Sequence, residues 1–226
     1  MDLFVVAGVA ALIIPSITSH EAAHGYVADR LGDPTARERG RLTLNPIPHI
    51  DPMFTIAVPL FLLLSGAGVI FGGAKPVPVD VSRLRNPRRD WALVALAGPA
   101  TNLAVALVLS AVFAILIRGE IVPASSRVAG VLATGIYVNA LLVVFNLLPI
   151  PPLDGSRVVQ FFLSGAALRG YRQLERFGLL LVLAFVFFFP PGQEFLVRAV
   201  GALTLLVTSP FGVSRAVAMA LGGLAG

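Results

Sequence analysis

The sequence of 226 residues contains no cysteine. Disulfide bonds and metal sites built on thiolates are therefore excluded. Charged residues are also scarce, at 13% of the chain, whereas ordinary soluble domains carry about a quarter. Together with 57% hydrophobic residues, this composition indicates a protein whose solvent is largely lipid.

The sequence also lacks several features that would divide or redirect the chain. Met1 to Leu3 contain no lysine or arginine, so the first hydrophobic run is not expected to be a cleavable signal peptide. No repeat of solenoid period and no long linker is visible, which predicts one integral membrane domain over residues 1–226. No arginine cluster alternates with aromatic residues, so nucleic acid is not an expected partner. Basic residues between hydrophobic runs instead mark the cytoplasmic side of a membrane.

Six hydrophobic runs account for most of the chain. They are Leu3–Ser19, Met53–Ala74, Trp91–Ile117, Val128–Ile150, Phe177–Pro190 and Phe195–Ser209. The third and fourth reach the ~20 residues that span a bilayer, whereas the fifth and sixth are shorter and could tilt, pair or lie partly in the interface. The pattern predicts an all-α polytopic membrane protein with about five spanning helices. Between the runs, the alternating residues 41–44 suit a short strand.

Two of the three histidines flank a glutamate in the sequence HEAAH, residues 20–24. A helix places His20 and His24 on one face, one turn apart, within reach of a single zinc ion. Glu21 can turn toward a zinc-bound water and act as its general base. Such residues also occur by chance on amphipathic surface helices. In an otherwise apolar membrane run, however, a glutamate and two histidines are costly and indicate function.

A catalytic zinc needs a third protein ligand and an open position for water. Asp154 is the best candidate, because it follows prolines that end the fourth run, where the freed backbone must be covered by protein or water. The alternative is that Asp154 caps a helix that begins near Ser156. His49 lies among turn residues, which favours a surface or structural role over a ligand role.

In combination, HEAAH and the later sequence NLLPIPPLDG, residues 146–155, resemble the site-2 protease family of intramembrane zinc metalloproteases. The segments GRLTLNP (40–46), GGAKPV (72–77) and AGPATN (97–102) are similar to further elements of that family. The resemblance covers nearly the whole chain. The form of the family that the chain resembles is a compact one, because the chain has no room for a PDZ domain or for a pair of nucleotide-sensing domains.

The resemblance implies one zinc ion bound by His20, His24 and Asp154, with Glu21 as the base. It also implies that Asn146 orients substrate or stabilises the oxyanion; an amide that packs helices or satisfies the backbone is the alternative. The implied activity is hydrolysis of peptide bonds in or near transmembrane segments of membrane protein substrates. A non-proteolytic zinc-containing membrane scaffold or binding module is the second hypothesis. A transporter or metal channel is the third, although its polar residues would recur at several depths.

A zinc ion shared by His24 and Asp154 fixes the relative direction of two helices. Each residue lies at the C-terminal end of its hydrophobic run, so the two runs must be parallel and only one of the two runs between them can cross. Residues 91–117 are long enough to span. Residues 53–74, interrupted by Pro59 and by glycines, are expected to form a re-entrant or partly inserted element. This arrangement puts nearly all basic loop residues on one side, which the positive-inside rule makes cytoplasmic.

The expected orientation places the N-terminus outside and the active site toward the cytoplasmic side of a cell membrane, prokaryotic by its alanine- and arginine-rich composition. The re-entrant element and the pieces at 40–46 and 72–77 would then lie near the zinc. An exposed strand edge there could pair with an unwound substrate, since the peptide bonds of a helix are shielded.

Overall fold

The computed structural model describes residues 2–65 and 72–223. Within these residues the chain is helical and contains no strand. Four segments are long and apolar enough to cross a membrane: Leu3–Arg30, Pro87–Arg118, Arg127–Asn146 and Pro190–Phe211. The predicted class, an all-α polytopic membrane protein, is confirmed.

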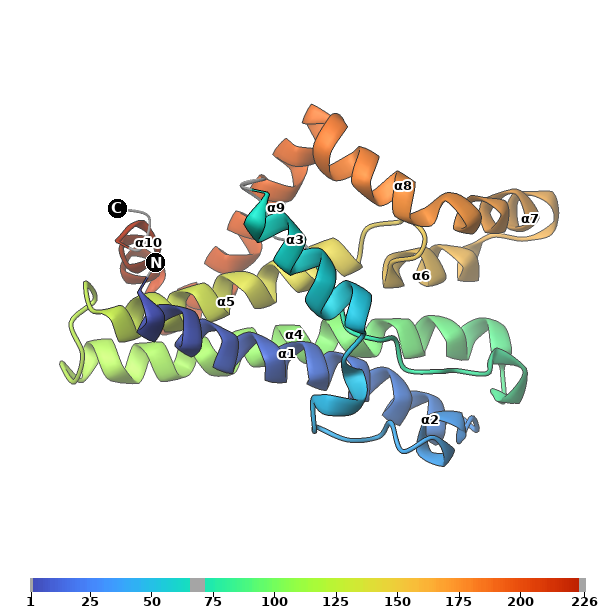
Figure 1. Cartoon of the computed structure of the whole chain (residues 1–226), viewed down its shortest axis with the longest axis horizontal. Helices are drawn as coiled ribbons and strands as arrows, with labels where there is room; N and C mark the ends of the chain where they lie inside the picture. Colours follow the sequence, from blue (N-terminus) through green and yellow to red (C-terminus); the bar gives the residue numbers. More distant parts are fainter. Residues whose placement is uncertain (1, 66–71, 224–226) are drawn as a thin grey trace.

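Three long helices lie side by side and form the centre of the molecule (Figure 1). They are α1 (Leu3–Arg30), α4 (Pro87–Arg118) and α5 (Arg127–Asn146). In Figure 1, α1 and α5 run in the same direction and α4 runs in the opposite one. The parallel arrangement predicted for the first and fourth hydrophobic runs is therefore present. The end of α1 lies next to the beginning of α4, where the Arg85 N–H donates to the Leu31 carbonyl at 3.0 Å.

Small residues let these helices approach closely. Buried alanines of α4 and α5 pack around Phe113 and Ile136 in a core that also receives Val207 and Val217 from later helices. In lipid, where burial of apolar surface between helices gains little, such close packing is a main source of helix association. The remaining helices are α2 (Thr35–Glu38), α3 (Val58–Leu64), α6 (Asp154–Phe162), α7 (Gly165–Gln173), α8 (Gly178–Leu183), α9 (Pro190–Thr208) and α10 (Ser214–Gly222).

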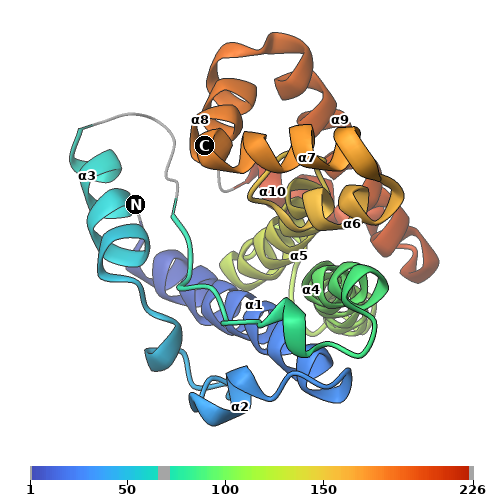
Figure 2. The same cartoon turned by 90° about the vertical axis from the view of Figure 1, so that its right-hand side faces the viewer.

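The run predicted to re-enter, residues 53–74, leaves the bundle and returns. It begins with a π-helical turn, Pro52–Ala57, and continues as α3, on one side of the bundle in Figure 2. Residues 66–71 lie outside the described part. At the return, the Gly73 N–H donates to the Phe54 carbonyl at 3.0 Å, and the Thr55 hydroxyl donates to the Gly73 carbonyl at 2.6 Å. Both ends of the run therefore lie together, which agrees with a re-entrant element.

Among the described residues, four helices are long and apolar enough to span, where about five spanning helices were expected. The difference lies in the fifth run, residues 177–190, which forms only α8 and a π-helical turn, Ala184–Phe188. The helix cannot continue because Pro190 and Pro191 lack the N–H groups that it would need. Instead these prolines begin α9, where the first N–H groups are free in any case. The two termini consequently lie at the same end of the molecule (Figure 1).

The strand-like pieces do not form strands in the described residues. Pro46, Pro76 and Pro78 have no N–H groups to complete a ladder. Side chains attach the pieces instead. The Arg41 guanidinium donates to the Lys75 carbonyl at 2.7 Å, beside one backbone bond from the Lys75 N–H to the His49 carbonyl at 2.8 Å.

Candidate metal centre

The HEAAH sequence lies within α1, which continues without interruption past Pro15 and ends at Arg30. Asp154 is the first residue of α6 and is not its N-cap; Leu153 occupies that position, and no side chain caps the helix. The capping role considered for Asp154 is therefore absent. His20 and Asp154 are buried, and His24 lies at the edge of burial, 9% exposed.

Both histidine rings are held through Nδ1. The His24 Nδ1 lies 2.7 Å from the Val94 carbonyl, and the His20 Nδ1 lies 2.6 Å from the Asn102 side-chain oxygen. Since an oxygen of either kind only accepts, each Nδ1 carries the proton. Each Nε2 then presents a lone pair to the centre, as neutral imidazole ligands do.

The carboxylate of Asp154 completes the group. Its Oδ2 lies 3.2 Å from the His20 Nε2 and 3.3 Å from the His24 Nε2. Its Oδ1 lies 3.4 Å from Nη1 of Arg157, and that nitrogen donates to the Pro152 carbonyl at 2.7 Å. Arg157 also stacks over the Trp91 ring, 4.9 Å from its centroid. Arg157 therefore fixes the Asp154 carboxylate so that Oδ2 is directed toward the histidines.

These three groups fit one metal ion. The two Nε2 atoms lie 3.0 Å apart with no proton between them, and the Asp154 Oδ2 is buried without a hydrogen-bond donor in the described part of the chain. Three lone pairs facing one another are unfavourable unless a cation binds them. Two ligand atoms of a tetrahedral zinc ion are roughly 3.3 Å apart at the usual bond lengths. The donor set is one of nitrogen and carboxylate oxygen, which zinc accepts.

Two glycines make the arrangement possible. A Cβ atom on Gly98 would lie 2.5 Å from Nε2 of both His20 and His24, so only glycine leaves room on this face of α4. A Cβ atom on Gly155 would lie 2.2 Å from the Leu147 carbonyl oxygen. Glycine at 155 therefore lets α6 begin directly against the end of α5, which places Asp154 opposite the histidines.

A cavity of about 150 Å³ opens beside the three ligands. It is large enough for several water molecules. Glu21 lines it, and its Oε2 accepts from the Val77 N–H at 2.9 Å, while its Oε1 forms no hydrogen bond within the described residues. Pro76, Val77 and Val79 also line the cavity, so the extended segment after the re-entrant element lies at the centre, as expected.

Asn146 and His49 occupy different environments. Asn146 is the last residue of α5 and lines the cavity, while its amide nitrogen donates to the Leu142 carbonyl at 2.9 Å. Asn146 thus satisfies a backbone carbonyl, which was the alternative role considered for it, and it also lines the cavity beside the metal centre. His49 is 2% exposed and its Nε2 bonds the Thr43 carbonyl at 3.1 Å, away from the ligand group. This position agrees with the structural role predicted for His49.

Sequence reasoning named none of Gly98, Asn102 and Arg157 individually, although the first two lie in the segment AGPATN. An available signal was Asn102 itself, a polar residue within a long apolar run. Its partner Asn139 is another such residue. For Arg157, no signal distinguished it from other loop arginines.

Comparison with known proteins gives concordant results. Peptidase family M50 matches residues 115–189, which include Asn146 and Asp154. “Putative zinc metalloprotease YwhC” of Bacillus subtilis (strain 168) is 39% identical over 178 residues, covering 76% of this chain and 76% of that protein. The chain belongs to peptidase family M50, the site-2 proteases. No solved structure matches.

Other M50-type relatives are mycobacterial. “Putative zinc metalloprotease Rip2” of Mycolicibacterium smegmatis is 32% identical, covering 74% of this chain and 61% of that protein. “Putative zinc metalloprotease Rip2” of Mycobacterium tuberculosis (strain H37Rv) is 35% identical, covering 78% of this chain and 67% of that protein. The family and the four apolar helices make this M50 protein an integral membrane protein of metalloprotease type.

Proposed function

We propose that this chain is a zinc metalloendopeptidase that hydrolyses peptide bonds in or near transmembrane segments of other membrane proteins. The observation that supports it best is the meeting of three lone-pair donors, His20, His24 and Asp154, beside a cavity that Glu21 lines. A zinc ion held for structure usually has four protein ligands. Three ligands next to a cavity with a free carboxylate oxygen favour hydrolysis over the scaffold hypothesis.

Zinc bound to this group would polarise the scissile carbonyl and lower the pKa of a water molecule. The protein then has to move one proton. Glu21 is anchored through one oxygen to the Val77 N–H, so its other oxygen can take the proton from the water and pass it to the leaving amine. Asn146, which lines the same cavity, is proposed to orient the substrate or to donate to the oxyanion.

The extended segment 72–80 offers a place for an unwound substrate. The segment is attached to the protein by Arg41, which donates to the Lys75 carbonyl, and by the buried Asp33, whose Oδ2 accepts from the Asp80 N–H at 2.6 Å. The Val77 carbonyl and the Val79 N–H have no hydrogen-bond partner in the described part, and both residues line the cavity. In an extended chain, residues two apart direct their backbone groups to the same side. A substrate strand could therefore pair with Val77 and Val79 next to the ligands.

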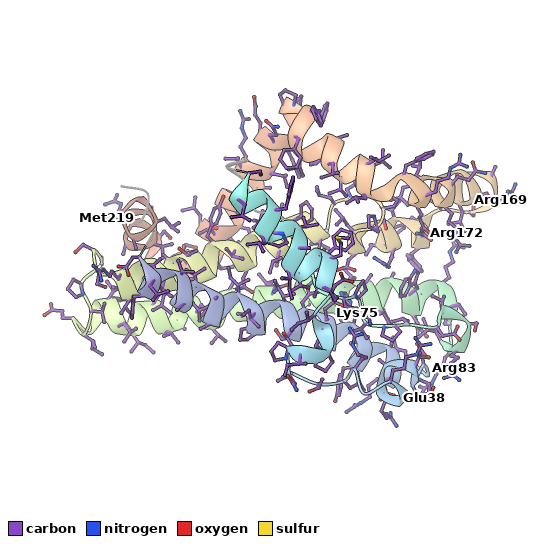
Figure 3. All side chains as sticks on the ribbon, viewed as in Figure 1. Glu38, Lys75, Arg83, Arg169, Arg172 and Met219 are labelled. Carbon is purple, nitrogen blue, oxygen red and sulfur yellow. The ribbon has the colours of Figure 1, made fainter. Side chains whose placement is uncertain are left out.

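The proposed localisation is a bacterial cell membrane, with the active site toward the cytoplasm. Arg83, Arg169 and Arg172 lie at the end of the molecule where α1 ends and α4 begins, whereas Met219 lies at the opposite end (Figure 3). The positive-inside rule makes the arginine-bearing end cytoplasmic. With four crossings, both termini then lie outside.

Metal removal is the direct test of the activity. Purified chain is incubated with solubilised membrane proteins, and new amino termini are identified by mass spectrometry. We expect new termini within transmembrane segments, their loss after treatment with a zinc chelator, and their return when zinc is added back. Undiminished formation of the same termini by protein shown to contain no metal would contradict the proposed function.

The orientation is tested by single cysteines, for which the absence of natural cysteine provides a clean background. Asp51→Cys and Asn86→Cys flank the re-entrant element and should both react with an impermeant thiol reagent only from the cytoplasmic side. Ser125→Cys, in the loop between α4 and α5, should react only from outside and serves as the control. Labelling of Asn86→Cys from outside would show that residues 53–74 cross the bilayer.

A further inference from the structure

A buried chain of polar groups connects α5 to His20. Asn102 and Asn139 are 0% exposed and Ser16 is 2% exposed, although all three lie within membrane-spanning helices. Such residues are costly in lipid unless each polar atom has a partner. Here the partners are one another.

The hydrogen bonds of this chain have a fixed direction. The Asn139 Nδ2 donates to the Gly135 carbonyl at 2.9 Å and to the Ser16 Oγ at 3.0 Å, so the Asn139 Oδ1 must face Asn102. The Asn102 Nδ2 donates to that Oδ1 at 3.0 Å and to the Ser16 carbonyl at 3.3 Å. The Asn102 Oδ1 consequently faces the His20 Nδ1. Because a carbonyl can only accept, Gly135 fixes the orientation of the Asn139 amide, and the Asn139 Oδ1 together with the Ser16 carbonyl fixes that of the Asn102 amide.

If these hydrogen bonds ran in the opposite direction, the centre would lose its ability to bind a metal ion. If the Asn102 amide turned over, its NH₂ group would face the His20 Nδ1, which would then have to accept. The ring proton would move to Nε2, where the Asp154 Oδ2 lies 3.2 Å away. The centre would then satisfy itself by an internal hydrogen bond, and the lone pair needed for a metal would be lost.

We propose that Asn139, which is hydrogen-bonded to no metal ligand, is a positioning residue of the metal centre. By holding the Asn102 amide in one orientation, it keeps the proton of His20 on Nδ1 and the Nε2 lone pair toward the metal. This inference rests on the proposed zinc site and deepens it, since it assigns a role in metal affinity to a residue of a third helix.

The test measures zinc affinity in the full chain, by competition with a chelator, with the absorption spectrum of the cobalt-loaded protein as a second readout. Asn139→Leu removes one of the two acceptors of the Asn102 amide, and we expect a loss of about 10-fold in affinity, the lower end of the range for groups bonded directly to a metal ligand. Asn139→Asp retains an oxygen that can accept from the Asn102 Nδ2. It should therefore keep an affinity near that of the parent. Ser110→Ala, which removes another buried hydroxyl of α4, is the control.

The outcomes separate the possibilities. Equal loss in Asn139→Leu and Asn139→Asp, or no loss in either, overturns the role of Asn139. If Asn139→Leu does not fold, Asn139→Ala replaces it: it removes the same acceptor of the Asn102 amide with a smaller side chain and should also weaken zinc binding. Unchanged affinity in Asn139→Ala then overturns the proposal. A parent protein that binds no zinc would instead refute the metal site itself.

Discussion

Glu21→Gln is expected to abolish peptide hydrolysis while leaving zinc binding unchanged. The glutamine oxygen can still accept from the Val77 N–H, which Glu21 contacts at 2.9 Å, so the side chain should keep its place in the cavity. An amide cannot take a proton from water at neutral pH. Because general-base catalysis contributes about 10²–10⁴-fold, cleavage should fall by at least that range. The measurement is the rate at which new termini form, beside zinc content by elemental analysis.

Glu194→Gln is the matched control for this substitution. Glu194 lies on α9, and its side chain is 68% exposed and paired with Arg198, which is 82% exposed. Exposed pairs of this kind contribute little to stability, so cleavage should equal that of the parent. Full cleavage activity in Glu21→Gln would show that another group is the base. Loss of zinc in the same variant would show instead that Glu21 is needed to build the site.

The sequence predicted those features of the metal centre that depend on spacing along one helix or on the relative direction of two helices. His20 and His24 share a helix face, so their spacing alone places both rings together. Asp154 was predicted because it follows the prolines that end the fourth hydrophobic run. The common depth that a shared metal requires then predicted that residues 53–74 return to the side from which they leave. The bonds between Gly73 and residues 54 and 55 agree with that requirement.

Other features follow from prolines, side-chain contacts and helix packing that the hydrophobic pattern does not record. The fifth run had the composition of a spanning helix, but adjacent prolines at 190 and 191 divide it from α9. The piece at 40–46 had the alternation of a strand, yet Arg41 attaches it through carbonyl groups of the segment that follows the re-entrant element. The role of Gly98 follows only from the distance between two helix axes.

Gly98→Ala is expected to prevent zinc binding, with a loss in affinity of at least about 100-fold. The added Cβ would lie 2.5 Å from both ligand nitrogens, a distance that requires something to move. The His24 ring cannot retreat freely, because its Nδ1 is bonded to the Val94 carbonyl of the same helix that bears the new methyl group. The His20 ring is held in the same way by Asn102. The helices must separate or both hydrogen bonds must break.

The measurement is the increase in thermal unfolding temperature that zinc produces, because a ligand that binds only the folded state stabilises it. The parent should show a clear increase and Gly98→Ala none. Gly201→Ala, on α9, is the control: nothing lies within 4 Å of its added Cβ, so it changes a glycine of a spanning helix without touching the centre. Alanine is also the better helix former by about 1 kcal/mol. A glycine-to-alanine change in a helix is therefore not expected to impair folding in general. If only Gly98→Ala loses zinc binding, the cause is the contact of its methyl group with the histidines. Equal zinc-induced stabilisation in both variants would place the metal elsewhere.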